Sequence, residues 1–274
     1  MNQKALNALE YPKIIEKLTE KASSYMGKQL CKNLEPSTDL ETIRLMQVQT
    51  KDALTRLFQK GSISFGNVKD IRGSLKRLEI GSSLGIGELL AICSLLENTN
   101  RVKAYSRSER GDSLPDSLDG MFEALEPLTP LTTEIRRCIL SEDEISDDAS
   151  STLKHIRRAM KQTNQKIHTQ LTALVSSASN QDKLQDAIVT MRNGRYCIPV
   201  KQEYRSSFQG MIHDQSASGN TLFIEPMSVV TLNNELKELE GKEQSEIEHI
   251  LSMLSEQASY VVDDLAHDQK TLVL

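Results

Sequence analysis

The chain has 274 residues, of which 38% are hydrophobic, 26% are charged and 4% are aromatic. This length suits one large domain or two modest ones, and a core of Leu, Ile, Val and Ala favours helices over a β-sandwich. The formal net charge of −5 excludes a chain coated throughout with nucleic-acid-binding charge, but it is compatible with a local basic patch.

Residues 1–140 predict a helical core. Apolar residues recur at helical spacing in several segments of this region, and Gly or Pro separates the segments. Pro12 lies near the start of an early helix, Asp39 is the expected N-cap of a longer one, and Gly61 is its expected stop. Residues 106–120 are rich in polar residues, Gly and Pro, and we expect a loop there.

Two long amphipathic helices are expected after the core. Residues 141–185 form the outgoing helix, whose narrow apolar stripe begins near Ser146 and meets neither Gly nor Pro. At 1.5 Å per residue this helix would be roughly 55 Å long, and a single stripe requires a partner. Residues 227–274 carry the same spacing, and they predict a returning helix that packs antiparallel to the first.

Residues 186–226, between the two helices, are the only β-like region. Four strand-like segments alternate with turns, and Asn193-Gly194 is a strong hairpin signal because both turn residues need positive φ. Pro199 suggests that its strand lies at an edge. A simple meander would bring the Arg192–Arg195 turn and the Ser216–Asn220 turn to one shared tip, far from the helices. The predicted fold is therefore mainly α, with two antiparallel helices that carry a small antiparallel sheet.

Catalytic and metal-binding motifs are missing from this sequence. The nearest stretch to a phosphate-binding loop, residues 81–88, lacks the lysine and does not follow a strand. His213 and Asp214 are neighbours in a strand, so they point to opposite faces and are poorly placed for a proton relay. The four cysteines lie far apart, which gives no support to a zinc or redox site. We predict that this chain is not an enzyme and holds no cofactor or metal.

The localisation follows from segments that the sequence lacks. The N-terminus has no apolar signal-peptide core, and no run approaches 18 apolar residues, so we predict a cytoplasmic protein without contact with a membrane. The mostly apolar segment Thr271–Leu274 shows no cap or stop signal, and we expect the sequence to continue in a longer protein.

Basic side chains of the small sheet are the candidate nucleic-acid contacts. Arg192 and Arg195 flank the hairpin turn, where two guanidinium groups suit a phosphate backbone. Residues 186–226 carry four basic and four acidic side chains, so any patch is local, and ordinary solubilising charge is an equally good explanation. A basic face on the outgoing helix (Lys154, Arg157, Arg158 and Lys161) is better explained as a solvated flank. The candidate nucleic-acid-binding residues are Arg192, Asn193, Arg195, Lys201 and Arg205.

Several stretches of the sequence are distinctive: RNGRY (192–196), PVK (199–201), HDQSASG (213–219), TLFIEP (221–226), VTLNNEL (230–236) and, near the N-terminus, LEYPKI (9–14). Through these stretches the chain resembles the second bacterial MutS paralogue family, which includes MutS-type endonucleases and a ribosome quality-control factor. The resemblance covers the whole chain and is most specific between residues 186 and 240.

The resemblance implies a helical core, a lever of long helices and a clamp that faces nucleic acid. It also implies that ATP, Mg²⁺ and endonuclease chemistry belong to ATPase and nuclease domains outside this sequence, and that the full-length protein is a homodimer. Two roles are attached to the family: binding branched DNA to suppress recombination, and recognising collided ribosomes, with their rRNA, to split them. The residues do not separate these roles. The alternative is a purely structural coiled-coil arm that dimerises or transmits ATPase motion without touching nucleic acid.

Overall fold

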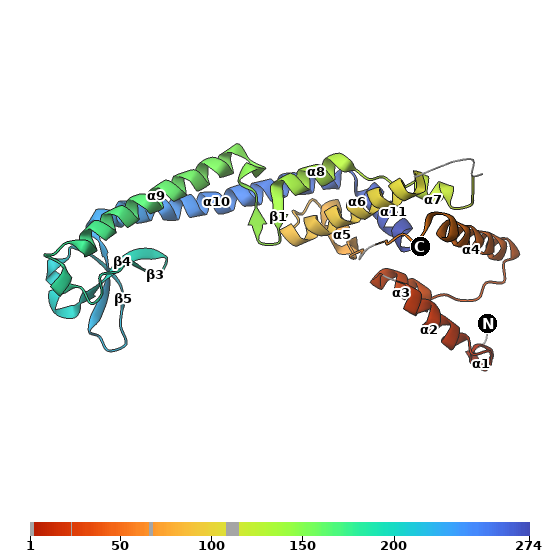
Figure 1. The fold of residues 1–274 in the computed structure, drawn as a ribbon, viewed down its shortest axis with the longest axis horizontal. Helices are drawn as coiled ribbons and strands as arrows, with labels where there is room; N and C mark the ends of the chain where they lie inside the picture. Colours follow the sequence, from red (N-terminus) through yellow and green to blue (C-terminus); the bar gives the residue numbers. More distant parts are fainter. Residues whose placement is uncertain (1–2, 23, 66–67, 108–114) are drawn as a thin grey trace. The chain divides into compact units, whose positions relative to one another are not determined.

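The computed structural model describes the chain except residues 1–2, 23, 66–67 and 108–114. It contains two compact units, and each is described by itself. The first unit combines residues 1–146 with residues 250–274, and the second consists of residues 147–249. Both are rich in helices, and each contains a small antiparallel sheet, which confirms the predicted mainly α class (Figure 1).

The first unit is built from helices and one short hairpin. Local sequence signals set several helix boundaries: Pro12 lies in the first turn of α2, the Asp39 carboxylate accepts from the first turn of α4, and Gly61 ends α4 with φ of 78°. The elements are α1 (Gln3–Ala8), α2 (Tyr11–Lys21), α3 (Tyr25–Lys32), α4 (Leu40–Lys60), α5 (Arg72–Glu79), α6 (Ile86–Arg107), α7 (Asp119–Glu123), α8 (Thr129–Cys138), β1 (Ile139–Ser141), β2 (Glu144–Ile145) and α11 (Val262–Val273).

The core of the first unit lies among α5, α6, α8 and α11. Leu89, Ile92 and Leu96 of α6 are fully buried there, together with Ile135 of α8 and Leu265 of α11. The apolar residues of α4 remain largely exposed, so α4 forms as predicted but its stripe is not covered by the described residues. The β1–β2 hairpin was not predicted, so residues 186–226 are not the only β region, as the sequence had suggested.

The second unit carries the predicted helix pair and sheet. Its elements are η1 (Asp147–Ala149), α9 (Ser151–Ser176), η2 (Gln181–Lys183), β3 (Thr190–Arg192), β4 (Arg195–Lys201), η3 (Gln202–Ser207), β5 (Gly210–Gln215), β6 (Thr221–Pro226) and the first part of α10 (Met227–Ser259).

Polar contacts define how α9 and α10 pair. The Ser150 hydroxyl donates to Glu246 at 2.7 Å, Arg157 Nε to Glu243 at 2.7 Å, and the Thr163 hydroxyl to Glu235 at 3.0 Å. Residue numbers rise along α9 while they fall along α10, so the two helices run antiparallel, side by side, as predicted (Figure 1). Further along, Ile167, Leu171 and Val175 of α9 share one apolar cluster with Val229 and Leu236 of α10.

Both long helices are shorter than the sequence predicted. α9 ends at Ser176 rather than near residue 185, because Ser177 and Ser179 bond to each other and the Asn180 side-chain amide donates to the Leu174 carbonyl at 3.0 Å, capping the helix end. The returning segment is two helices, since α10 stops at Ser259 and α11 starts at Val262. β-Branched valines at this junction have a lower helix propensity than the residues before them.

The sheet is not the simple meander that was predicted. The strand order is β3-β4-β6-β5, so β6 lies between β4 and β5 and is antiparallel to both. This order gives the inner position to β6, whose residues are mostly buried, and leaves the largely exposed β5 at an edge. η3 carries the chain back along the sheet, and β5 therefore runs parallel to β4 rather than antiparallel to it.

Pro199 does not mark an edge strand, because β4 is an inner strand. β3 pairs with β4 only as far as Cys197, and the Pro199 carbonyl accepts from the Gln185 backbone N–H at 3.0 Å. The N–H and C=O of one strand residue point to the same side. A backbone N–H at position 199 would therefore face the segment around Gln185. Its absence in proline removes no hydrogen bond between β4 and β6.

Candidate nucleic-acid interface

The hairpin turn between β3 and β4 is the predicted two-residue turn. Asn193 has φ of 50° and Gly194 has φ of 71°, and Arg192 pairs with Arg195 across it. The turn lies against α10, because a Cβ added at Gly194 would be 2.8 Å from the Lys237 Nζ. Glycine therefore provides both the left-handed backbone and the space, and the turn contacts a helix instead of standing clear of it.

Arg195 belongs to a network around a buried carboxylate. Its guanidinium donates to Glu225 at 2.9 Å and to the Asn234 side chain at 2.7 Å, and only 23% of its side chain is exposed. Glu225 is fully buried. Its carboxylate also accepts a hydrogen bond from the Asn233 side-chain amide at 2.8 Å and lies 2.5 Å from His213 Nε2. A buried carboxylate needs such partners, since unpaired burial of a charge is very costly.

Asn233 joins this network to the backbone of β4. Its side-chain oxygen accepts from the Tyr196 N–H and its amide donates to the Tyr196 carbonyl, both at 3.2 Å. One α10 side chain therefore satisfies both backbone groups of a strand residue, as a neighbouring strand would. The network fixes the sheet to the start of α10, which explains what Glu225 and Asn233 do in the stretches TLFIEP and VTLNNEL.

Arg192 lies across the sheet rather than outward from it. Its guanidinium carbon is 3.9 Å from the centroid of the Phe223 ring, and Nε is 3.2 Å from an Asp214 carboxylate oxygen. It also donates to the Thr190 hydroxyl at 3.1 Å. Asp214 pairs with Arg192, and His213 contacts Glu225, so the structure agrees with the prediction that His213 and Asp214 form no relay. About a third of the Arg192 side chain remains exposed (37%).

The remaining candidates lie in two places. The Asn193 amide donates to the His213 carbonyl at 2.9 Å, so Asn193 lies beside Arg192 and Arg195. Lys201 is at the other end of β4, where it pairs with Thr221 and donates to the Asp182 carbonyl at 2.8 Å. The exposed Arg205 follows in η3.

The predicted shared tip is wrong. The Ser216–Asn220 turn lies beside Lys201, where the Gln202 N–H donates to the Asn220 carbonyl at 3.0 Å, at the end of β4 opposite to Arg195. The insertion of β6 between β4 and β5 separates the two turns. Arg192 and Arg195 are therefore not at a common tip with residues 216–220.

The Lys and Arg residues of α9 have no acidic residue beside them on that helix. This helix contains five basic residues and no acidic one, whereas α10 contains seven acidic and two basic residues. Two of the α9 cations have partners within the unit: Lys154 pairs with Asp148 at 2.7 Å, and Arg157 pairs with Asp147 and Glu243. Burial lowers the pKa of Arg157, but the hydrogen bonds to these two carboxylates outweigh it and raise that pKa above its ordinary value.

The cysteines are free thiols, and Cys93, Cys138 and Cys197 are buried. Burial raises the pKa of Cys93 and of Cys197 to about 11, so both are inert thiols at neutral pH. In the part of the chain that the structure describes, no three His, Cys, Asp or Glu residues are grouped to hold a metal ion. Within the same residues, no helix combines the length and hydropathy needed to cross a bilayer.

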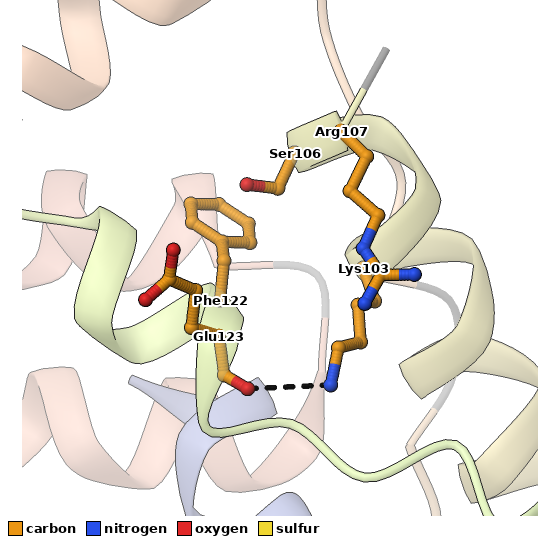
Figure 2. Close-up of a pocket in the computed structure, with 5 residues that line it drawn as sticks. All are labelled: Lys103, Ser106, Arg107, Phe122 and Glu123. Atoms are coloured by element: carbon orange, nitrogen blue, oxygen red, sulfur yellow. Dashed lines mark hydrogen bonds between the residues drawn. The ribbon is translucent and has the colours of Figure 1, made fainter. Parts of the chain in front are cut away.

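Figure 2 shows a pocket of the first unit, of about 370 Å³, lined by Lys103, Ser106, Arg107, Phe122 and Glu123. The Lys103 ammonium group donates to the Glu123 carbonyl at 3.2 Å and to the Leu125 carbonyl, and its Nζ is 3.8 Å from the Glu126 carboxylate. This cation is occupied in holding the segment that follows α7. The second cation of the pocket is Arg107, at the end of α6.

Sequence reasoning missed three members of the site. The sequence predicts Glu225 only as part of a helix start with Pro226, and Asn233 only as part of a larger stretch, although an acidic residue that ends an apolar strand can signal a buried ion pair. Lys166, five residues beyond Lys161, was not included in the predicted basic face. An exposed helix face at this spacing still includes it, since α9 turns once every 3.6 residues.

The second unit is thus an antiparallel helix pair that carries a small antiparallel sheet.

Sequence comparison leads to a particular family. The chain is 54% identical to Endonuclease MutS2 of Lachnoclostridium phytofermentans, 51% to that of Agathobacter rectalis and 48% to that of Lachnospira eligens, over 99 to 100% of its length. It spans 34 to 35% of the length of these relatives. No protein-family model matches the chain. The chain belongs to the MutS2 family.

Proposed function

We propose that this chain is the non-catalytic core, lever and clamp region of a MutS-like ATPase and that it binds nucleic acid. The identity of 54% to a protein named as an endonuclease, over 99% of the chain, is the observation that carries the proposal, because an endonuclease must hold a nucleic acid. Branched DNA and the rRNA of collided ribosomes are the two targets proposed. ATP and Mg²⁺ binding, strand cleavage and homodimer formation are assigned to the full-length protein.

The arrangement of the second unit supports this proposal physically. The apolar cluster runs without interruption from α9 and α10 into β4 and β6, through Ile167, Leu236, Ile198 and Ile224. Such a core makes the helix pair and sheet one stiff body, since packed interiors transmit displacement. A stiff arm suits a protein that closes around a large target under the control of a distant ATPase.

The purely structural arm remains the second candidate function. It is favoured by the intramolecular partners of Arg192 and Arg195, which leave these two cations less free than the sequence suggested.

The test uses the 274-residue chain with labelled four-way-junction DNA, linear duplex DNA and purified ribosomes. We expect fluorescence anisotropy or co-sedimentation to detect binding at about 50 mM salt that weakens as salt rises. Binding to ribosomes but not to the junction would select the ribosomal role, and the reverse would select the DNA role. A chain that binds none of them would be a structural arm. Hydrolysis of ATP by the chain would contradict its non-catalytic assignment.

A further inference from the structure

The outer face of α9 carries cations that the second unit does not neutralise. Arg158, Lys161 and Lys166 are exposed, and they form no hydrogen bond or ion pair with the residues that the structure describes. In the buried stripe of the same helix, Thr163, Ile167 and Leu171 face α10 and the sheet. The three free cations therefore lie on the face that looks away from the unit's own core.

The sequence of α9 maintains a local repulsion here. Arg158 and Lys161 are three residues apart, and Lys154 and Arg158 are four apart, so like charges are neighbours on one helix surface. Like-charged pairs at this spacing destabilise a helix, whereas a Glu at one of these positions would have stabilised it. α10 supplies acidic residues, but of the α9 cations only Arg157 pairs with one of them. Like charges are therefore kept together on α9 although no contact within the unit offsets their repulsion. Such an arrangement indicates that an external anion neutralises them.

The neighbouring side chains indicate which anion fits. Gln162, Gln165 and Thr169 interleave with the cations on the exposed face, and α9 contains no Phe, Tyr or Trp. A membrane-binding helix would need exposed apolar residues beside its cations, and a single-strand-binding surface would need aromatic rings for base stacking. Cations with polar side chains and no stacking platform match the sugar-phosphate backbone of a double helix.

The spacing also fits a double-stranded backbone. Arg158 to Lys166 spans eight residues, which is about 12 Å along the helix axis. Duplex DNA presents one phosphate per about 1.7 Å of its axis, so several phosphates lie within reach of three side chains over this length.

We propose that the outer face of α9, formed by Arg158, Lys161 and Lys166, binds the phosphate backbone of double-stranded nucleic acid. The proposal rests on the proposed function, and it moves the main electrostatic contact from the sheet to the lever helix. DNA and RNA duplexes share this chemistry, and the experiment below includes both.

The experiment replaces the three residues together, as Arg158→Gln, Lys161→Gln and Lys166→Gln. All three side chains are exposed and unpaired, so the variant retains its packing. The matched control is Lys51→Gln, Lys76→Gln and Lys242→Gln, which removes the same charge from exposed lysines that also form no side-chain ion pair with the described residues. Affinity for a DNA duplex and for an RNA duplex is measured over a series of salt concentrations, and circular dichroism checks the fold.

Each lost phosphate contact reduces the magnitude of the slope of log K against log salt by about 0.9. The slope of the α9 variant should therefore be smaller in magnitude by about 2.7 than that of the unsubstituted chain. Between 50 and 200 mM salt, the unsubstituted chain should then lose about 40-fold more affinity than the variant. The control should keep the original slope on both duplexes.

Equal slopes for the α9 variant and the control would overturn the assignment of α9 while leaving nucleic-acid binding intact. A loss of slope confined to the RNA or to the DNA duplex would support the proposal and identify the source of the phosphates. Failure of the unsubstituted chain to bind either duplex would overturn the assignment of α9, whereas the proposed function is overturned only if the chain also fails to bind ribosomes.

Discussion

Arg195→Ala tests whether the hairpin arginine stabilises the sheet. The substitution removes the 2.9 Å ion pair to Glu225 and the 2.7 Å hydrogen bond to Asn234, and it leaves Glu225 buried. Removal of one partner from a buried ion pair costs 3–5 kcal/mol. Since 23% of the Arg195 side chain is exposed, we expect the lower end of that range, about 3 kcal/mol.

The assay uses cysteines that the chain already contains. Cys197 of β4 is fully buried in the second unit, so a thiol reagent reaches it only when the sheet opens. A destabilisation of 3 kcal/mol corresponds to a labelling rate about a hundredfold higher when opening and closing are fast. Cys93 and Cys138 are buried in the first unit and serve as internal controls, whose labelling should not change.

The matched control is Arg205→Ala. Arg205 is exposed, and its side chain donates to the Phe208 carbonyl at 3.3 Å, so its loss should change Cys197 labelling by less than about fivefold. If Arg195→Ala leaves the labelling of Cys197 unchanged, the argument that Arg195 stabilises the sheet through a buried network is refuted.

Three further substitutions test packing and titration. Gly210→Ala would place a Cβ 2.1 Å from the Glu225 carbonyl oxygen, so we expect the rate of Cys197 labelling to rise strongly. Gly241 of α10 has open space around it, so Gly241→Ala should instead raise the free energy of unfolding, measured in urea, by about 0.5–1 kcal/mol. Burial raises the pKa of Asp268 from 3.8 to about 6, so the folded chain binds the extra proton and its stability falls as pH rises through this interval. Asp268→Asn should therefore gain up to about 3 kcal/mol over the unsubstituted chain between pH 4 and pH 7, and equal pH profiles in urea unfolding would contradict this account.

Local signals in the sequence predicted the elements well. The Asp39 cap, the Gly61 stop and the Asn193-Gly194 turn act over a few residues, and each has the structure that its chemistry requires. The stripes of α9 and α10 predicted the antiparallel pair, because two half-apolar helices of this length have to cover each other.

Strand order could not be predicted from the same signals. Each strand was recognised, but the pairing of β6 with both β4 and β5 depends on which strand is buried on both sides. The alternation of apolar and polar residues within β5 and β6 does not show which of the two strands pairs with β4. The rule that successive strands pair as hairpins predicts β5 beside β4, which is wrong. The error moved the Ser216–Asn220 turn to the wrong end of the sheet.

The candidate site was limited by a similar difficulty. A sequence shows that Arg195 is basic, but not that a buried Glu225 from another strand occupies its guanidinium. The reverse holds for α9, where only the structure shows that α10 leaves Arg158, Lys161 and Lys166 without partners. The distinction between an engaged and a free cation depends on contacts between segments far apart in the chain.

Amine footprinting of the unsubstituted chain tests most directly where nucleic acid binds. Lysines are acetylated with and without bound duplex, and the modified positions are identified by mass spectrometry. We predict that Lys161 and Lys166 become protected on binding, while Lys51 and Lys76 react equally in both samples. Protection of Lys201 together with unchanged reactivity of Lys161 and Lys166 would place the contact on the sheet and contradict the account.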